Sequence, residues 1–179
     1  MIKNKMQDAF NKQIGEEIYS SYLYLSMAAY FETINLKGFS HWMRCQAQEE
    51  MFHAMRFFNH ILERGGEVSL PRIEEPKHKW ESPLNIFQDG LVHEEHITDC
   101  INKLMDLAVE EKDYAAQNLL KWFVTEQVEE EDNFMEMVAK LKMIGGNQPS
   151  LLLQDKEMTT RMPGLNPWLD TIPAAPVGA

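Results

Sequence analysis

The sequence predicts an all-α protein, a four-helix bundle with one long crossover connection and a short fifth helix near the C-terminus. Four long stretches repeat apolar residues at helical spacing, and we find no strand pattern. The connection between the second and third stretches has about 17 residues and can extend to roughly 55 Å. A helix of about 27 residues is only roughly 40 Å long. The connection can therefore cross the whole bundle and leave the second and third helices parallel.

The helix boundaries follow from breaks in these patterns. The long helices are expected at about residues 4–34, 38–64, 83–110 and 114–144, and the short fifth helix at about 150–161. Gly65-Gly66 is typical of a helix end, and Ser82 followed by Pro83 is typical of a helix start. The chain accordingly divides into a bundle over 1–145, a short-helix segment over 146–162 and an irregular Pro-, Gly- and Ala-rich tail over 163–179.

The composition narrows the classes of partner and site. The chain has 179 residues, enough for one domain with a full core, and a formal net charge of -11. This charge argues against nucleic acid or an anionic membrane as the main partner. Cys45 and Cys100 form no CxxC pair, so we expect neither a disulfide framework nor a zinc or rubredoxin-type site. Without a bilayer-spanning stretch or a signal peptide, a cytoplasmic location is expected.

Polar residues interrupt the apolar stripe near the middle of each long helix. They are Glu17 on the first helix, Glu50 and His53 on the second, Glu94 on the third, and Gln127 and Glu130 on the fourth. Four carboxylates at one depth of a dry core would repel one another strongly. Their four negative charges match two divalent metal ions, and Glu-x-x-His supplies an oxygen and an imidazole ligand from one helix face. The pattern therefore predicts a dinuclear metal centre.

Four motifs give the chain a resemblance to the bacterial non-haem ferritins over residues 1 to about 160. They are Glu17-Ile-Tyr-Ser-Ser with Tyr24, Ala47-Gln-Glu-Glu-Met-Phe-His53, His93-Glu94, and Glu126-Gln-Val-Glu-Glu-Glu131. The resemblance implies the ferritin-like bundle and a shell of twenty-four subunits. It also implies a ferroxidase, which oxidises Fe(II) with O2 or H2O2 and stores iron as a ferric mineral.

The same resemblance assigns roles to individual residues. It implies one iron site at Glu17, Glu50 and His53, a second at Glu94 and Glu130 with Glu50 bridging, a nearby hydrogen-bonding or water-holding Gln127, and a third iron site at Glu49, Glu126 and Glu129. Tyr24 would donate to a ligand carboxylate and could supply an electron, although a core tyrosine is the alternative. Glu49, Glu126 and Glu129 could equally be a solvated acidic face. For Trp122, packing is the main expectation and electron transfer a secondary one.

Other readings stay open at this point. A bacterioferritin would ligate haem through Met51, but the second Glu-x-x-His of that family is absent and haem is not expected. A rubrerythrin-like peroxidase or an R2-like radical protein would need a rubredoxin module or two Glu-x-x-His motifs. If the chain were a metal-free helical interaction protein, nothing would explain its buried carboxylates. The tail residues Leu165, Trp168, Leu169 and Ile172 could dock on the subunit or a partner. We expect His41, His60, His78, His93 and His96 at the surface or at helix ends, with no metal partner.

Overall fold

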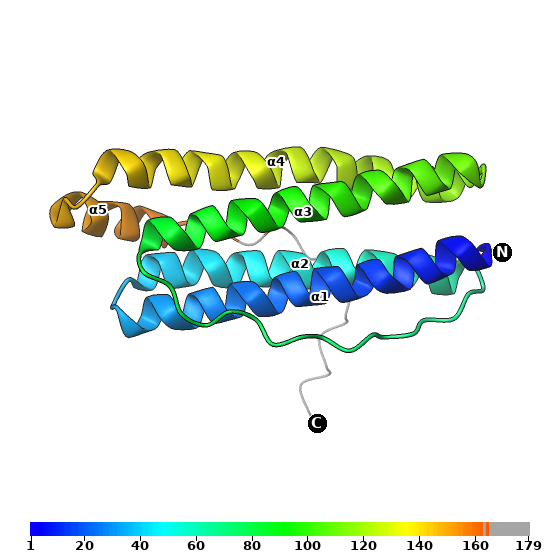
Figure 1. Cartoon of the computed structure of the whole chain (residues 1–179), viewed down its shortest axis with the longest axis horizontal. Coiled ribbons are helices and arrows are strands. Elements are labelled where there is room, and N and C mark those ends of the chain that lie inside the picture. Colours follow the sequence, from blue (N-terminus) through cyan, green and yellow to red (C-terminus); the bar gives the residue numbers. More distant parts are fainter. Residues whose placement is uncertain (163, 165–179) are drawn as a thin grey trace, which may run out of the picture.

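The computed structural model describes residues 1–162 and Gly164, and this part of the chain is all-α. Its elements are α1 (Asn4–Thr33), α2 (Lys37–Glu63), α3 (Pro83–Glu110), α4 (Tyr114–Ile144) and α5 (Gln148–Met158). Four long helices lie side by side, and α5 packs across one end of them (Figure 1). None of the described helices is both long and apolar enough to cross a membrane. The predicted fold class is therefore confirmed.

The crossover between α2 and α3 runs along the whole bundle, as predicted (Figure 1). It follows α1, to which it is tied by hydrogen bonds from the Ser69 amide to Asn11 Oδ1 at 2.9 Å and from the Ser26 hydroxyl to the Lys77 carbonyl at 2.7 Å. Because the chain returns to the starting end of α2 before α3 begins, α2 and α3 run parallel.

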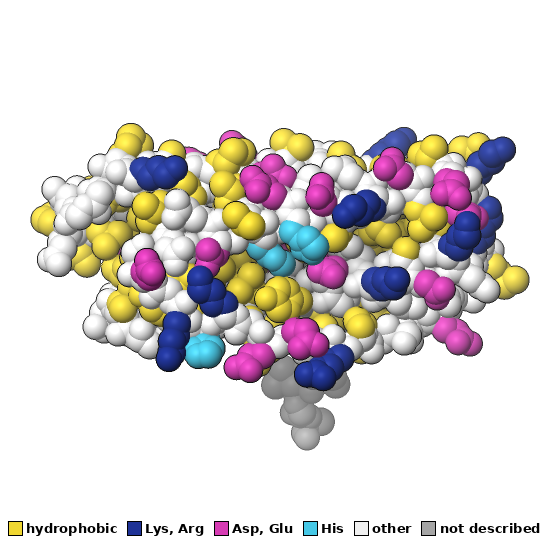
Figure 2. Space-filling model, in the orientation of Figure 1, with side chains coloured by type: hydrophobic (Ala, Val, Ile, Leu, Met, Phe, Trp, Pro, Cys, Tyr) yellow, Lys and Arg dark blue, Asp and Glu magenta, His cyan; other side chains and the backbone are white. Residues whose placement is uncertain are grey.

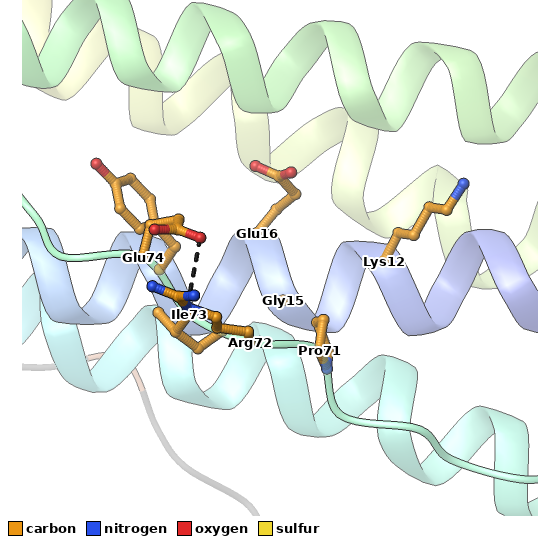
Figure 3. Close-up of a pocket in the computed structure, with 8 residues that line it drawn as sticks. Lys12, Gly15, Glu16, Pro71, Arg72, Ile73 and Glu74 are labelled. Carbon is orange, nitrogen blue, oxygen red and sulfur yellow. Dashed lines mark ion pairs between the residues drawn. The ribbon is translucent and has the colours of Figure 1, made fainter.

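One surface pocket of about 420 Å³ lies between α1 and the crossover (Figure 3). Pro71 packs so tightly against Gly15 there that a Cβ at Gly15 would overlap its ring. Arg72 and Glu74, both highly exposed, form an ion pair of 3.6 Å at the pocket. The residues that line the pocket include none of the predicted site residues.

The core consists of two apolar clusters with a polar layer between them. One cluster contains Phe31, Phe39, Phe87 and Phe134, and the other contains Phe10, Phe57, Ile101 and Phe123. On every long helix the two clusters leave a gap in the middle. The polar residues predicted to interrupt the four stripes occupy this gap, so the layer follows from where each helix changes from apolar to polar.

The predicted bounds of α5 were wrong at both ends, and its start has a clear cause. The helix begins at Gln148 rather than at 150, because the Asn147 side chain accepts a hydrogen bond from the Ser150 amide at 2.9 Å and caps it. It ends at Met158 rather than near 161. The predictions for the tail 163–179 lie outside the described residues, apart from Gly164.

Candidate metal centre

The polar layer is closed to solvent on all four helices. The side chains of Glu17, Glu50, His53, Glu94, Gln127 and Glu130 are buried, and the most accessible of them is 4% exposed. Each comes from the middle of a long helix whose flanking turns pack in the two apolar clusters. Four carboxyl groups, one imidazole and one amide therefore share the centre of the bundle.

One half of the layer is built by α1 and α2. Ligand atoms of Glu17, Glu50 and His53 all lie within 4.8 Å of one another. His53 Nδ1 lies 3.2 Å from Glu50 Oε2, and Gln13 donates to Glu17 Oε1 at 3.0 Å. The other carboxylate oxygens, Glu17 Oε2 and Glu50 Oε1, are buried without a hydrogen-bond partner among the described residues. Two free buried acceptors facing an imidazole suit a bound cation.

The other half joins α3 and α4. Tyr24 donates from α1 to Glu94 Oε1, and Gln127 Nε2 donates to Glu94 Oε2 at 3.1 Å. Gln46 of α2 donates to Glu130 Oε2 at 2.7 Å. Glu130 is near enough for its charge to raise the pKa of Glu94, but the described residues form no three-residue ligand group that contains Glu94.

His53 also faces the second half of the layer. Its ligand atoms group with those of Glu126 and Glu130 within 4.8 Å, and Nε2 lies 3.8 Å from Glu126 Oε1. The imidazole thus stands between Glu50 on one side and Glu126 with Glu130 on the other. This second grouping was not predicted, because Glu126 was expected only at a separate third site.

The pKa values of the buried groups show that the polar layer contains too little positive charge for its carboxylates. Burial raises the pKa of Glu50 well above its usual value and raises that of Glu94 to about 8, with Glu130 adding to the latter. Burial also raises the pKa of Glu130 to about 6. Burial is the largest single effect on His53 and would lower its pKa, but the carboxylates of Glu50, Glu126 and Glu17 together outweigh it and raise the pKa well above its usual value. Because these pKa values are raised, protons on the buried groups take the place of bound metal ions in the metal-free protein.

Comparison with known proteins identifies the family. A family model described as "Ferritin-like domain" matches residues 7–144. The chain belongs to the ferritin-like family. The bacterial non-heme ferritin of Bacteroides fragilis strain 638R is 44% identical over 145 residues, which cover 81% of this chain and 91% of the relative. That of Staphylococcus saprophyticus is 37% identical over 161 residues, covering 90% and 96%. The resemblance to bacterial non-haem ferritins is therefore confirmed.

Solved ferritin structures agree with this family assignment. The structure described as a novel open pore ferritin from the hyperthermophilic archaeon Archaeoglobus fulgidus is 51% identical to this chain. It superposes with a TM-score of 0.89 and covers 90% of this chain and 98% of that one. A ferritin from the same organism, engineered into a closed form, gives the same TM-score and identity.

The residues that the ferritin resemblance assigned to a third iron site are not grouped in this structure. Glu49 accepts from Arg161 Nη2 at 2.6 Å and from the Gly164 amide at 2.6 Å. Glu126 faces His53, and Glu129 is exposed. The contact with Arg161 was not predicted because Arg161 follows α5 and lies 112 positions after Glu49.

Two supporting glutamines were also missed in this ferritin sequence. Gln13 lies four residues before Glu17, so helical spacing alone could have linked them. Gln46 is completely buried and reaches from α2 to Glu130 on α4, a contact that no local spacing signals.

The aromatic neighbours pack closely around the ferritin centre. Tyr24 is completely buried, donates to Glu94 and stacks on Phe134 at 5.6 Å between ring centroids. Trp122 is half-buried and lies edge-on to His53 at 5.4 Å, with the Arg56 guanidinium 3.8 Å above its ring. These contacts suit the packing expected of Trp122.

Three further expectations from the sequence concern Met51, His93 and His96. Met51, where a haem ligand would lie, is 42% exposed on α2. His93 was expected at the surface or a helix end, and its position excludes only the helix end. It is half-buried in the middle of α3, with Nε2 2.7 Å from Ser20 Oγ, and burial lowers its pKa to about 4. His96 was expected to have no metal partner, but its ligand atoms group with those of Glu16 and Cys100.

Proposed function

We propose that this ferritin-like chain is a ferroxidase that oxidises Fe(II) at a dinuclear centre in the polar layer. One iron ion would bind to Glu17, Glu50 and His53, and the other to Glu94 and Glu130, with Glu50 bridging the two. The observation that carries the proposal is the pair of buried, unpartnered oxygens, Glu17 Oε2 and Glu50 Oε1, beside His53. Two divalent ions would satisfy these acceptors and balance the four carboxylates.

The two halves of the layer would hold iron differently. The first half offers an imidazole nitrogen and free carboxylate oxygens. In the second half, hydrogen bonds from Tyr24 and Gln127 already engage Glu94, and one from Gln46 engages Glu130. An iron ion there must share or displace these donors, so it should bind more weakly and leave more readily.

Oxidation at this centre needs no resident cofactor. Each of two ferrous ions gives one electron to dioxygen, which takes up two protons and leaves as hydrogen peroxide. The raised pKa values of Glu50 and Glu94 mean that metal binding releases protons from these carboxyl groups inside the layer. The ferric ions would then move to the cavity of a twenty-four-subunit shell and join a mineral there.

The test is an anaerobic titration with ferrous salt followed by exposure to air. Rapid ferric absorption in the ultraviolet should appear at two irons per subunit, and further additions should yield mineral inside particles of constant size. Glu50→Ala should abolish the rapid phase, because it removes the proposed bridge. Glu95→Gln is the matched control, since Glu95 is exposed on α3 next to Glu94.

Two results would contradict the proposal. If Glu50→Ala oxidised iron as fast as the unaltered protein, the layer would not be the site of oxidation. If the unaltered protein neither took up iron nor gained stability from divalent ions, a metal-free helical interaction protein would be the better description. A Soret band in purified protein would instead indicate haem.

A further inference from the structure

Three side chains with different metal-ligating atoms meet on the outside of the α1–α3 pair. Ligand atoms of Glu16, His96 and Cys100 all lie within 4.8 Å of one another. His96 and Cys100 are four residues apart on α3 and share a face, while Glu16 approaches from α1. In Figure 3 the Glu16 carboxylate points toward α3 and away from the crossover. We propose that Glu16, His96 and Cys100 form a surface site for a borderline-soft divalent cation such as Zn²⁺.

The distances fit such an ion. Glu16 Oε2 lies 3.1 Å and Cys100 Sγ lies 3.6 Å from the same atom, His96 Nε2. Zinc bonds of about 2.0–2.2 Å to nitrogen and oxygen and about 2.3 Å to sulfur, at tetrahedral angles, separate nitrogen from oxygen by about 3.4 Å and nitrogen from sulfur by about 3.6 Å. The two separations from nitrogen are therefore within a few tenths of an ångström of those in a zinc site. The oxygen and sulfur atoms lie within 4.8 Å of each other and would move to about 3.6 Å apart when an ion binds.

The donor set separates this site from the buried centre. An imidazole, a carboxylate and a thiolate together favour zinc-like ions, and three protein ligands leave a fourth position for water. The proposed iron centre has no sulfur. A surface ion pair between Glu16 and His96 alone contributes little to stability. Cys45 and His41 make a similar thiol–imidazole contact at 3.7 Å, but among the described residues only the Cys100–His96 pair groups with a carboxylate.

The surroundings allow a cation to reach the site. The side chains of His96 and Glu16 are 53% and 41% exposed, and Cys100 is half-buried beside them. Near the thiol, the acidic residues Glu16, Glu17 and Asp99 outnumber the basic Lys103. Histidine side chains lie at the surface near the middle of this face of the molecule, with an acidic side chain beside them (Figure 2). Binding would break the S–H bond of Cys100 and release its proton to solvent as the sulfur–metal bond forms.

Cobalt is the probe for this site, because a thiolate bound to Co²⁺ gives a near-ultraviolet charge-transfer band. The full-length assembled protein should give the band with an intensity that corresponds to one thiolate-bound Co²⁺ per subunit, whatever the polar layer binds, and Zn²⁺ should abolish the band. Cys100→Ser should remove the band, and His96→Gln should weaken Co²⁺ binding by about tenfold or more. Helical circular dichroism would confirm that each variant is folded.

Matched controls cover the other thiol and another exposed histidine. Cys45→Ala and His78→Gln should each keep the band at unchanged affinity, since Cys45 lies on α2 and His78 on the crossover. The site is refuted if no band forms, if Cys100→Ser keeps it, or if His96→Gln binds Co²⁺ as tightly as the unaltered protein. Iron oxidation at the buried centre does not enter this measurement, so the two proposals can fail separately.

Discussion

Glu94→Gln should remove much of the pH dependence of stability of the metal-free protein. Burial raises the pKa of Glu94 from 4.5 to about 8. A carboxyl group with a raised pKa stabilises the folded state while it keeps its proton. This stability is fully present below pH 4.5 and is lost as the pH rises through about 8. Gln cannot ionise, and its amide oxygen can still accept the Tyr24 hydroxyl.

The size of the effect follows from the shift. About 1.4 kcal/mol per pKa unit gives a loss of about 5 kcal/mol for the unaltered protein between pH 4.5 and 8, with a slope of at most about 1.4 kcal/mol per pH unit from this group. Metal-free Glu94→Gln should lack this loss and should therefore be the more stable protein at pH 8. Glu50, Glu130 and His53 also have raised pKa values, so their contributions to stability fall with rising pH in both proteins, and the effect of Glu94 is the difference between the two pH curves.

The assay is guanidinium unfolding followed by circular dichroism, in the presence of chelator, at several pH values from 5 to 8. Glu95→Gln serves as the control and should stay within about 0.5 kcal/mol of the unaltered protein, because Glu95 is exposed. Adding Mn²⁺, a cation that prefers oxygen ligands, should reverse the order at pH 8, since only the unaltered protein keeps all four carboxylates.

Equal pH slopes for Glu94→Gln and the unaltered protein would refute this reasoning. Such a result would mean that Glu94 is solvated or already charged in the metal-free protein. If Mn²⁺ did not reverse the order of stability of the two proteins, Glu94 would still be a buried charge, but metal binding would not explain why it is buried.

Three further substitutions test other contacts. Gly90→Ala should destabilise the protein by about 1–3 kcal/mol in thermal unfolding, because the new Cβ would overlap the Phe134 ring. Arg161→Gln should cost about 1–3 kcal/mol in guanidinium unfolding by leaving a partly buried carboxylate unpaired, and adding Glu49→Gln should recover part of that loss. Tyr24→Phe should cost about 1–3 kcal/mol without metal and, on the proposed function, should slow single-turnover iron oxidation measured in the ultraviolet.

Sequence periodicity predicted most of the fold because each long helix carries its own signals. The crossover was predictable from chain length alone, since its reach exceeds the length of a helix. The start of α5 was misplaced because its cap, Asn147, precedes a proline and a weak apolar pattern. The helix bounds were therefore predicted well where the apolar stripe was long and poorly where it was short.

The apolar stripes predicted which residues of the site are buried, but not how these residues contact one another. Glu17, Glu50, His53, Glu94, Gln127 and Glu130 interrupt apolar faces, so burial follows from their spacing. Their hydrogen-bond partners do not, because Gln46 reaches across the bundle to another helix. Periodicity says which residues point inward, but it does not say which of them meet.

Glu49 shows why a ligand assigned from family resemblance must be checked against its contacts in the structure. Unlike Glu17 and Glu50, it has both oxygens engaged, by Arg161 Nη2 and the Gly164 amide. The Arg161 backbone is fixed as well, since His41 Nε2 lies 2.8 Å from its carbonyl oxygen. An iron ion at a third site would therefore have to displace a guanidinium from a partly buried carboxylate. Any such binding must compete with these contacts of Arg161 and Gly164, whereas no arginine or lysine of the described residues forms an ion pair with the four carboxylates of the polar layer.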